Sequence, residues 1–142
     1  MKTVRDILKI KGRDVWSVTV GATVFEALRL MAEKEVGALL VMDDRRIAGI
    51  ISERDYARKI VLLGRTSPNT RVEEIMSSHV VYTHPDQSIE ECMAIMTDRR
   101  IRHLPVMEEG KLVGIISIGD LVKTIITEQK FTIEQLERYI SG

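Results

Sequence analysis

GIISERD, residues 49–55, recurs later in the chain as GIISIGD, residues 114–120. At the same offset, Val15 to Val61 align with residues 80–126 without a gap, and apolar residues and glycines agree in one register. Agreement over this length indicates an internal duplication rather than a chance match of one phrase. The fragments that precede the two copies, TVRDIL and RVEEIM, also resemble each other, but at a different offset. The sequence therefore predicts two copies of one small fold.

Each copy is expected to have the element order β-α-β-β-α. The first helix begins with a capping-box pair, Thr23 with Glu26 in one copy and Ser88 with Glu91 in the other. Apolar residues then follow at helical spacing, and the two β-rich runs after the helix are joined by a polar turn, which predicts a hairpin. The expected strands span residues 15–18, 38–42, 47–51, 80–83, 103–107 and 112–116. The expected helices span residues 23–35, 52–63, 88–100 and 117–129.

The duplication divides the chain into a first repeat with its lead-in at residues 1–66, a second repeat at 67–127 and a C-terminal helix at 128–142. Thr132 and Gln135 form a further capping pattern, which predicts that this last helix begins separately. The expected fold class is α/β of the α+β type. A repeat of roughly 55 residues is marginally stable alone. We therefore expect the repeats to pack with pseudo-two-fold symmetry around a cleft, a common place for a ligand.

The composition narrows the classes of partner. Lys and Arg number 21, as do Asp and Glu, and this balance argues against a nucleic-acid partner or a polybasic membrane anchor. The single cysteine, Cys92, excludes an internal disulfide and fits a reducing compartment. The N-terminal residues lack the apolar run of a signal peptide, and no stretch approaches the ~20 apolar residues of a membrane span. These features predict a soluble cytoplasmic protein without a membrane partner.

The repeated phrase places a serine and an aspartate where a strand meets a helix. Ser52 and Ser117 are expected at the N-cap, with Asp55 and Asp120 three residues later. Such a pair can be simple helix capping, worth about 1 kcal/mol. It can also be a binding site, because a helix N-terminus attracts phosphate and a carboxylate can accept both ribose hydroxyls. The residues alone leave both readings open.

The two stretches 35–57, EVGALLVMDDRRIAGIISERDYA, and 100–122, RIRHLPVMEEGKLVGIISIGDLV, resemble the CBS domain family. Together they resemble a tandem CBS pair, or Bateman module, over residues 4–127, and the short tail resembles that of small stand-alone bacterial CBS-pair proteins. The first copy departs from the family pattern in having Val20-Gly21 where the second has Pro85-Asp86. It also has Leu40 in place of Pro105, so its strand openings fit less closely.

The resemblance implies a regulatory module that binds an adenine nucleotide in the cleft, without catalysis, and that dimerises as a flat disk. AMP, ADP, ATP, an NAD-like dinucleotide and S-adenosylmethionine are the implied ligands, and no cofactor is required. Asp55 and Asp120 would hold ribose hydroxyls, and cations such as Arg54 would meet phosphate. The full implied site comprises Ser17, Val18, Gly37, Ala38, Leu39, Ile51, Ser52, Arg54, Asp55, Tyr82, Thr83, Arg102, His103, Leu104, Pro105, Ile116, Ser117 and Asp120.

Other residues favour plain structural roles. Cys92 is expected on a buried helix face, and Trp16 is expected to pack rather than stack on a base. His79 and His84 lack partners at metal-ligand spacing, so no metal site is predicted. Two other functions stay open beside the regulatory one. They are a scaffold or nucleic-acid module with vestigial clefts, and an enzyme acting on a nucleotide, which no recognisable catalytic set supports.

Overall fold

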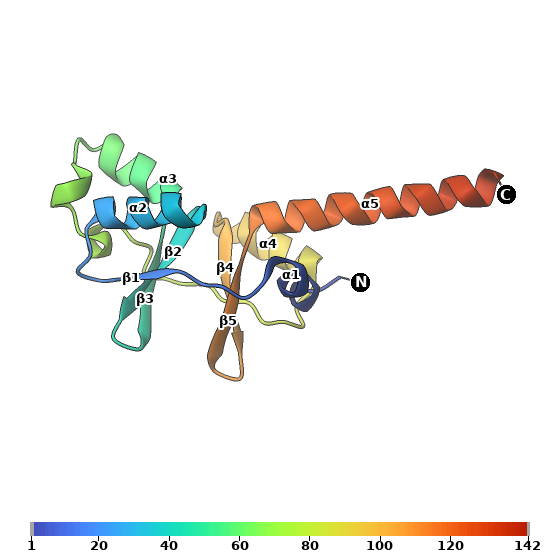
Figure 1. Ribbon diagram of the computed structural model, residues 1–142, viewed down its shortest axis with the longest axis horizontal. Helices are drawn as coiled ribbons and strands as arrows, with labels where there is room; N and C mark the ends of the chain where they lie inside the picture. Colours follow the sequence, from blue (N-terminus) through green and yellow to red (C-terminus); the bar gives the residue numbers. More distant parts are fainter. Residues whose placement is uncertain (1, 142) are drawn as a thin grey trace. The chain divides into compact units, whose positions relative to one another are not determined.

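The computed structural model describes residues 2–141, and these form two compact units (Figure 1). Unit 2 runs from Val15 to Val80. Unit 1 combines the described residues up to Asp14 with those from Val81 onward. Each unit has its own buried apolar cluster. The chain is thus of mixed α+β class, with one small sheet in each unit.

Unit 2 contains a three-stranded sheet in the order β1-β2-β3. Strand β1 (Ser17–Thr19) is parallel to β2 (Ala38–Asp43), which is antiparallel to β3 (Arg46–Ser52). Helix α2 (Val24–Lys34) connects β1 to β2. After β3 the chain forms α3 (Glu53–Tyr56) and continues as the π-helical turn η1 (Ala57–Val61). Two 3₁₀ turns, η2 (Ser67–Asn69) and η3 (Val72–Glu74), complete the unit.

Unit 1 contains a two-stranded antiparallel sheet of β4 (His103–Glu108) and β5 (Lys111–Ser117). Helix α1 (Val4–Lys11) and helix α4 (Ile89–Arg99) precede the sheet in sequence, and α5 (Ile118–Ser141) follows it. The hairpin turn includes Gly110 at a φ of 76°, a left-handed conformation that favours glycine.

The strand expected at residues 80–83 does not form, and only Thr83 makes an isolated bridge, to Val106. The reason is a proline. In unit 2, Leu40 N donates a 3.1 Å hydrogen bond to Trp16 O, which joins β1 to β2. The equivalent residue in unit 1 is Pro105, which has no N–H to donate. The missing donor shortens the parallel pairing in the second repeat.

The two helices with predicted capping pairs begin as expected. Thr23 Oγ1 accepts a hydrogen bond from Glu26 N, and Ser88 with Glu91 forms the full reciprocal capping box. Their buried faces are also as expected, with Val24, Ala27 and Met31 buried on α2. On α4 the buried residues are Ile89, Cys92 and Met96.

The prediction that a separate helix begins near residue 131 is wrong. Helix α5 continues from Ile118 to Ser141 without a break, as Figure 1 shows. Thr132 lies inside this helix, and its hydroxyl donates to Glu128 O at 3.0 Å instead of capping a new start. Threonine can make this bond to the preceding turn without ending a helix. Among residues 2–141, no helix combines the length and the apolar character that a membrane crossing requires.

Each lead-in segment packs on the sheet of the other repeat. In unit 1, Leu8 of α1 lies against Gly114 of β5, where an added Cβ would be 2.7 Å from Leu8 Cδ2. In unit 2, the segment after the first repeat brings Met76 and Ser77 against Gly49 of β3. Both glycines lie in the strand interior, buried, where another segment approaches closely. The two compact units therefore do not coincide with the two repeats read from the sequence. The predicted repeat boundaries, at residues 66 and 127, remain a prediction.

Candidate functional site: two serine–aspartate corners

In unit 2, the corner where β3 meets α3 is closed by a reciprocal capping box. Asp55 Oδ2 accepts from Ser52 N at 2.9 Å and from Ser52 Oγ at 3.1 Å. Ser52 Oγ accepts in turn from Asp55 N at 3.3 Å. These bonds satisfy N–H groups that a helix start leaves without intrahelical partners.

The equivalent corner in unit 1, between β5 and α5, has the same bonds between backbone and side chain. Asp120 Oδ2 accepts from Ser117 N at 2.8 Å, and Ser117 Oγ accepts from Asp120 N at 3.2 Å. The bonds from Ser117 N and from Lys11 Nζ both go to Oδ2 of Asp120, so neither of them occupies Oδ1. A carboxylate has about four lone-pair sites, so capping through one oxygen leaves the other able to accept further hydrogen bonds.

A lysine contacts the aspartate in each corner, and sequence reasoning missed both. Lys11 Nζ lies 2.7 Å from Asp120 Oδ2 and also donates to Ile115 O. Lys59 Nζ lies 3.5 Å from Asp55 Oδ1 and donates to Ile75 O. Lys59 follows Asp55 by one helical turn, a spacing the sequence could have revealed. Lys11 comes from the lead-in helix, and no local pattern links it to Asp120.

Charge and burial act in opposite directions on Asp120. Partial burial raises the pKa of this carboxyl, but the hydrogen bond from Lys11 and the bond from Ser117 N lower it by more. The pKa of Asp120 therefore lies below its ordinary value, and the carboxylate is ionised at neutral pH.

Strand pairing in unit 2 brings several predicted residues to the corner. Ala38 pairs with Ser52 across the β2–β3 ladder, and Gly37 O accepts from Glu53 N at 3.1 Å. Ser17 pairs with Leu40 on the other side of β2. The starts of β1 and β2 therefore lie at the same sheet end as the Ser52–Asp55 corner.

The same arrangement holds in unit 1. His103 pairs with Ser117, and Arg102 O accepts from Ile118 N at 2.8 Å. Thr83 N donates to Pro105 O, which brings the end of the 80–83 segment to β4. Tyr82, Arg102 and His103 are at least partly exposed at this end.

Some predicted site residues turn their side chains into the core. Leu39, Leu104, Ile51 and Ile116 are buried, so at these positions only the backbone could contact a ligand. Because side chains alternate along a strand, Ile50 and Ile115 face the opposite side of the sheet and are half-buried. Their side chains, unlike those of Ile51 and Ile116, are therefore partly accessible at the strand ends.

Two other predicted residues are also engaged with the protein interior. The Thr83 hydroxyl bonds to Gln87 Oε1 and lies 3.5 Å from Cys92 Sγ. Val18 packs against the core of unit 2. Burial raises the pKa of the Cys92 thiol, as expected for a core residue. Trp16 is partly exposed, with Lys34 Nζ 4.3 Å from its ring centroid, a cation–π contact.

The two corner geometries and their shared strand pairing agree with a recognised family pattern. The CBS domain family profile matches residues 4–62 and 72–127. The chain belongs to the CBS domain family. A solved CBS-domain structure from Burkholderia ambifaria matches with a TM-score of 0.86 and 57% identity, over 90% of this chain and 96% of that chain. This chain therefore carries a tandem pair of CBS repeats.

Two further comparisons extend the CBS relationship. The CBS domain-containing protein CBSX3, mitochondrial, of Arabidopsis thaliana is 37% identical over 99% of this chain and 72% of its own length. The CBS domain pair of protein MJ0100, solved with 5′-methylthioadenosine and S-adenosyl-L-methionine, matches with a TM-score of 0.77 over 90% of this chain and 98% of that chain. Its identity to this chain is 22%, so this last match concerns the fold.

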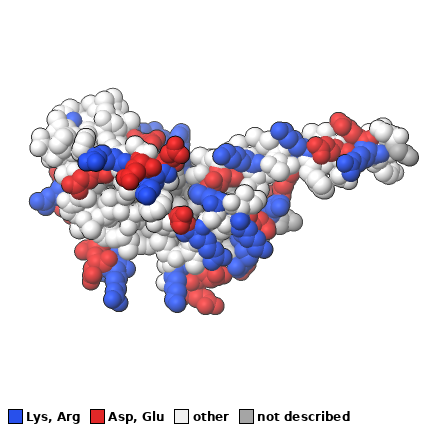
Figure 2. Space-filling model, viewed as in Figure 1, with Lys and Arg blue, Asp and Glu red and all other residues white. Residues whose placement is uncertain are grey.

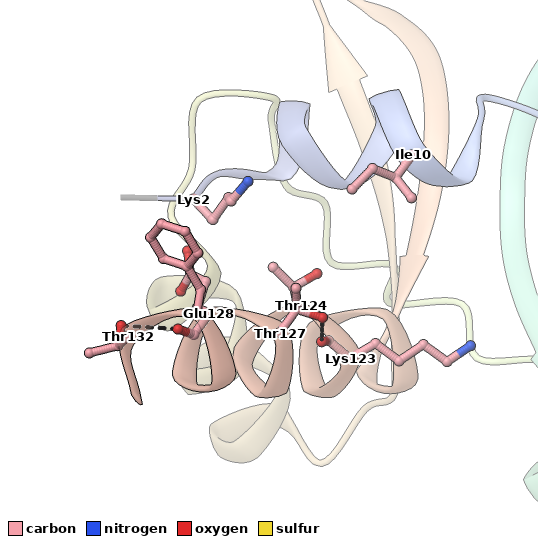
Figure 3. Close-up of a pocket in the computed structure, with 8 residues that line it drawn as sticks. Lys2, Ile10, Lys123, Thr124, Thr127, Glu128 and Thr132 are labelled. Carbon is pink, nitrogen blue, oxygen red and sulfur yellow. Dashed lines mark hydrogen bonds between the residues drawn. The ribbon is translucent and has the colours of Figure 1, made fainter. Parts of the chain in front are cut away.

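A separate cleft of about 770 Å³ lies between α1 and α5 in unit 1. Figure 3 shows Lys2 and Ile10 on one side and Thr124 and Thr127 of α5 on the other. None of the predicted nucleotide-binding residues of the CBS repeats lines this cleft. The hydroxyls of Thr124 and Thr127 donate to carbonyls of α5 itself.

Figure 2 shows basic and acidic side chains interspersed over the face in view, in keeping with equal numbers of the two signs. Within residues 2–141, no three His, Cys, Asp or Glu side chains are grouped closely enough to hold a metal ion.

Proposed function

We propose that this CBS pair is a regulatory module that binds an adenine nucleotide at its serine–aspartate corners. The observation that carries the proposal is that the two oxygens of the Asp120 carboxylate are used differently. The capping bond from Ser117 N and the bond from Lys11 Nζ both go to Oδ2, so neither of them occupies Oδ1. A ribose hydroxyl can donate to Oδ1 without breaking the cap. The structural and the ligand-binding roles of this aspartate are therefore compatible.

The neighbouring groups complete the proposed contacts. Lys11 has three N–H donors, of which two are engaged by Asp120 and Ile115, so a third can meet a phosphate oxygen. In unit 2, Asp55 and Lys59 take the corresponding roles, with Arg54 as a further cation. The backbone of residues 37–39 and 102–105 is proposed to read the adenine edge, beside Ile50 and Ile115.

The comparisons support the class of ligand. The CBS pair of MJ0100, which shares this fold, was solved with two adenosine compounds. AMP, ADP, ATP, an NAD-like dinucleotide and S-adenosylmethionine all present the same adenosine to the corner. For AMP, ~0.3 kcal/mol per heavy atom corresponds to a Kd on the order of 10 µM. We propose binding without turnover, in the cytoplasm, with the nucleotide altering the protein's contacts with a partner.

A thermal-shift panel of AMP, ADP, ATP, NAD, NADH and S-adenosylmethionine tests the function. A ligand present at about 100 times its Kd stabilises the folded state by about 2.7 kcal/mol, so a true ligand raises the Tm clearly. The Asp55→Ala and Asp120→Ala variants are each expected to weaken binding at least tenfold at one corner. If none of the six compounds shifts the Tm, the proposal is wrong.

Glu91→Ala is the matched control for these aspartate variants. Glu91 forms the same type of capping box with Ser88, but it lies at the start of α4 and not at a corner. Its loss carries a comparable capping cost, about 1 kcal/mol. We expect E91A to bind nucleotide like the wild type. Equal affinities in D55A, D120A and E91A would reduce the two aspartates to helix caps.

A further inference from the structure

Each serine–aspartate corner holds one lysine against its aspartate, but the two lysines come from different parts of the chain. Lys11 belongs to the lead-in helix α1, whereas Lys59 follows its aspartate by one helical turn. In the repeat alignment, Thr124 stands in the second copy where the first has Lys59. In the alignment of the two lead-ins, TVRDIL with RVEEIM, His79 stands opposite Lys11. The duplication alone therefore does not account for a lysine in both corners.

Backbone carbonyls hold both ammonium groups in place. Lys11 Nζ donates to Asp120 Oδ2 at 2.7 Å and to Ile115 O at 2.9 Å. Lys59 Nζ donates to Ile75 O at 2.9 Å and lies 3.5 Å from the carboxylate of its own corner. The side chains of the two lysines are 34% and 42% exposed, so a ligand in solution can reach them. Each corner therefore presents a positive charge at a fixed place.

We propose that Lys11 makes the corner of unit 1 selective for adenosine compounds with a 5′-phosphate, and that Lys59 supplies the equivalent charge in unit 2. The inference rests on the proposed function, because it concerns which adenosine compound the corner holds. A ribose whose hydroxyls bind Asp120 carries its 5′ substituent on the same small ring, which brings that substituent near Lys11. A further N–H of the ammonium can then donate to a phosphate oxygen, and such a charge-assisted hydrogen bond is stronger than a neutral one.

The same ammonium disfavours a positively charged 5′ substituent. S-adenosylmethionine carries a sulfonium at the 5′ position, where AMP carries its phosphate. An aspartate alone would attract the sulfonium, but the charge of Lys11 offsets that of Asp120 and repels a second cation. Specificity commonly depends on such a repulsive element as well as on an attractive one. Adenosine itself has neither the attraction nor the repulsion, so it serves as the neutral reference.

The other charges at this corner favour the same ligand. Arg102 directly precedes β4, at the same sheet end, and is exposed. The two residues between the serine and the aspartate of this corner are Ile118 and Gly119, which carry no charge. In unit 2 the corresponding residues are Glu53 and Arg54, whose opposite charges balance. In neither corner does this stretch add net negative charge that would offset the lysine.

Calorimetric titration of the full chain with AMP, adenosine and S-adenosylmethionine tests the selectivity. The D55A variant restricts the measurement to the corner of unit 1, where AMP should bind at least tenfold more tightly than the other two compounds. Adding Lys11→Met should weaken AMP binding at least tenfold and change adenosine binding by less than about threefold. In a chain that retains Asp55, K11M should weaken AMP binding at one of two sites only.

Lys9→Met is the matched control, because it removes the same charge from the same helix. Lys9 is exposed, and two positions along a helix correspond to a rotation of about 200°, so it points away from the side that carries Lys11. K9M should bind AMP like its parent chain. Equal losses of AMP affinity in K9M and K11M would show that the overall charge of α1 acts, and not the contact at the corner, and the proposal would then be wrong.

Moving the lysine tests whether Lys11 and Lys59 are equivalent. The K11M/T124K variant places the lysine of unit 1 where unit 2 has its own, one helical turn after the aspartate. It should recover the AMP affinity of the parent chain to within about threefold. K11M/T124M adds a side chain of similar length without charge and should stay as weak as K11M. A K11M/T124K chain no better than K11M/T124M overturns the equivalence of the two lysines.

The pattern of affinities separates this proposal from the proposed function. If AMP, adenosine and S-adenosylmethionine bind equally well, or if K11M weakens all three equally, Lys11 only supports the corner and the selectivity is wrong. Nucleotide binding itself would stand in that case. If none of the three compounds binds to the unaltered chain, the proposed function fails, and the selectivity fails with it.

Discussion

Lys11 Nζ lies 2.7 Å from Asp120 Oδ2, although the two residues are 109 positions apart in the chain. The contact joins the end of the lead-in helix α1 to the strand–helix corner of the second repeat. It places a cation beside the carboxylate that we propose holds ribose. The lead-in is therefore both a structural part of unit 1 and a part of its candidate site.

The first prediction concerns the pKa of Asp120. In Lys11→Met, the carboxyl loses the strongest of the contacts that lower its pKa, while its burial still raises it. We expect the pKa of Asp120 to rise, as measured by NMR titration of the side-chain carboxyl. Lys59→Met removes the corresponding lysine of unit 2 and should leave the Asp120 pKa unchanged. An unaltered Asp120 pKa in K11M would show that the contact is not maintained in solution.

The contact between Lys11 and Asp120 also makes the free energy of unfolding depend on pH. The pKa of Asp120 is lower in the folded than in the unfolded chain, so the unfolded state takes up its proton first as the pH falls. The stabilisation is present above the ordinary carboxyl pKa and is lost as the pH falls through the folded-state value. K11M should be less stable than the wild type by roughly 0.5–1 kcal/mol at pH 7, after allowance for solvent screening. In urea unfolding, this difference should shrink near pH 3.

The second prediction uses the two buried glycines. In Gly49→Ala the new Cβ would lie 2.6 Å from the backbone oxygen of Ser77, which is held by the bridge to Ile50. In Gly114→Ala the nearest atom is the end of the Leu8 side chain, which can rotate. We expect G49A to lose about 2–3 kcal/mol in urea unfolding and G114A about 1 kcal/mol.

Gly21→Ala is the control for the glycine series. An added Cβ at Gly21 has no heavy atom within 4 Å, and its stability should change by about 0.5 kcal/mol or less. G49A and G21A of equal stability would mean that the segment at Ser77 does not pack on β3 as described.

The third prediction locates the unit that depends on the N-terminal helix. Leu8 is buried in the core of unit 1, so Leu8→Ala should cost about 2–4 kcal/mol. Amide hydrogen exchange should accelerate in β4 and β5 more than in β2 and β3. Ile10→Ala, on the same helix but 84% exposed, should change little. Loss of protection mainly in β2 and β3 would show that α1 does not pack on the sheet of β4 and β5 as described.

Local patterns carried most of the correct sequence predictions. Ser52 with Asp55 and Ser88 with Glu91 form their boxes because a capping box needs only residues three apart. The repeated register identified the CBS pair, and the family match confirms it. By contrast, Thr132 has the sequence signature of a cap yet lies inside α5, because nothing ends the helix before it.

Features that depend on segments far apart could not be predicted from spacing. The sequence showed that Leu40 and Pro105 differ, and the structure shows that this difference removes the hydrogen bond that would hold residue 81 to β4. Lys11 reaches Asp120 only because α1 packs on the second repeat. The proposed adenine contacts of the site residues are still predictions, and the aspartate variants test them.

The crossed placement of the two lead-in segments bears on how this architecture arose. A shorter ancestor with one repeat would have carried a buried glycine on its sheet and, in its lead-in segment, the apolar residues that pack against such a glycine. Two such molecules could form a swapped dimer, in which the lead-in segment of each packs on the sheet of the other. End-to-end fusion of that swapped dimer would give the present chain, in which the lead-in segment of each repeat packs on the sheet of the other repeat. Cutting the polypeptide between its repeats should therefore yield fragments that are stable only when they are mixed.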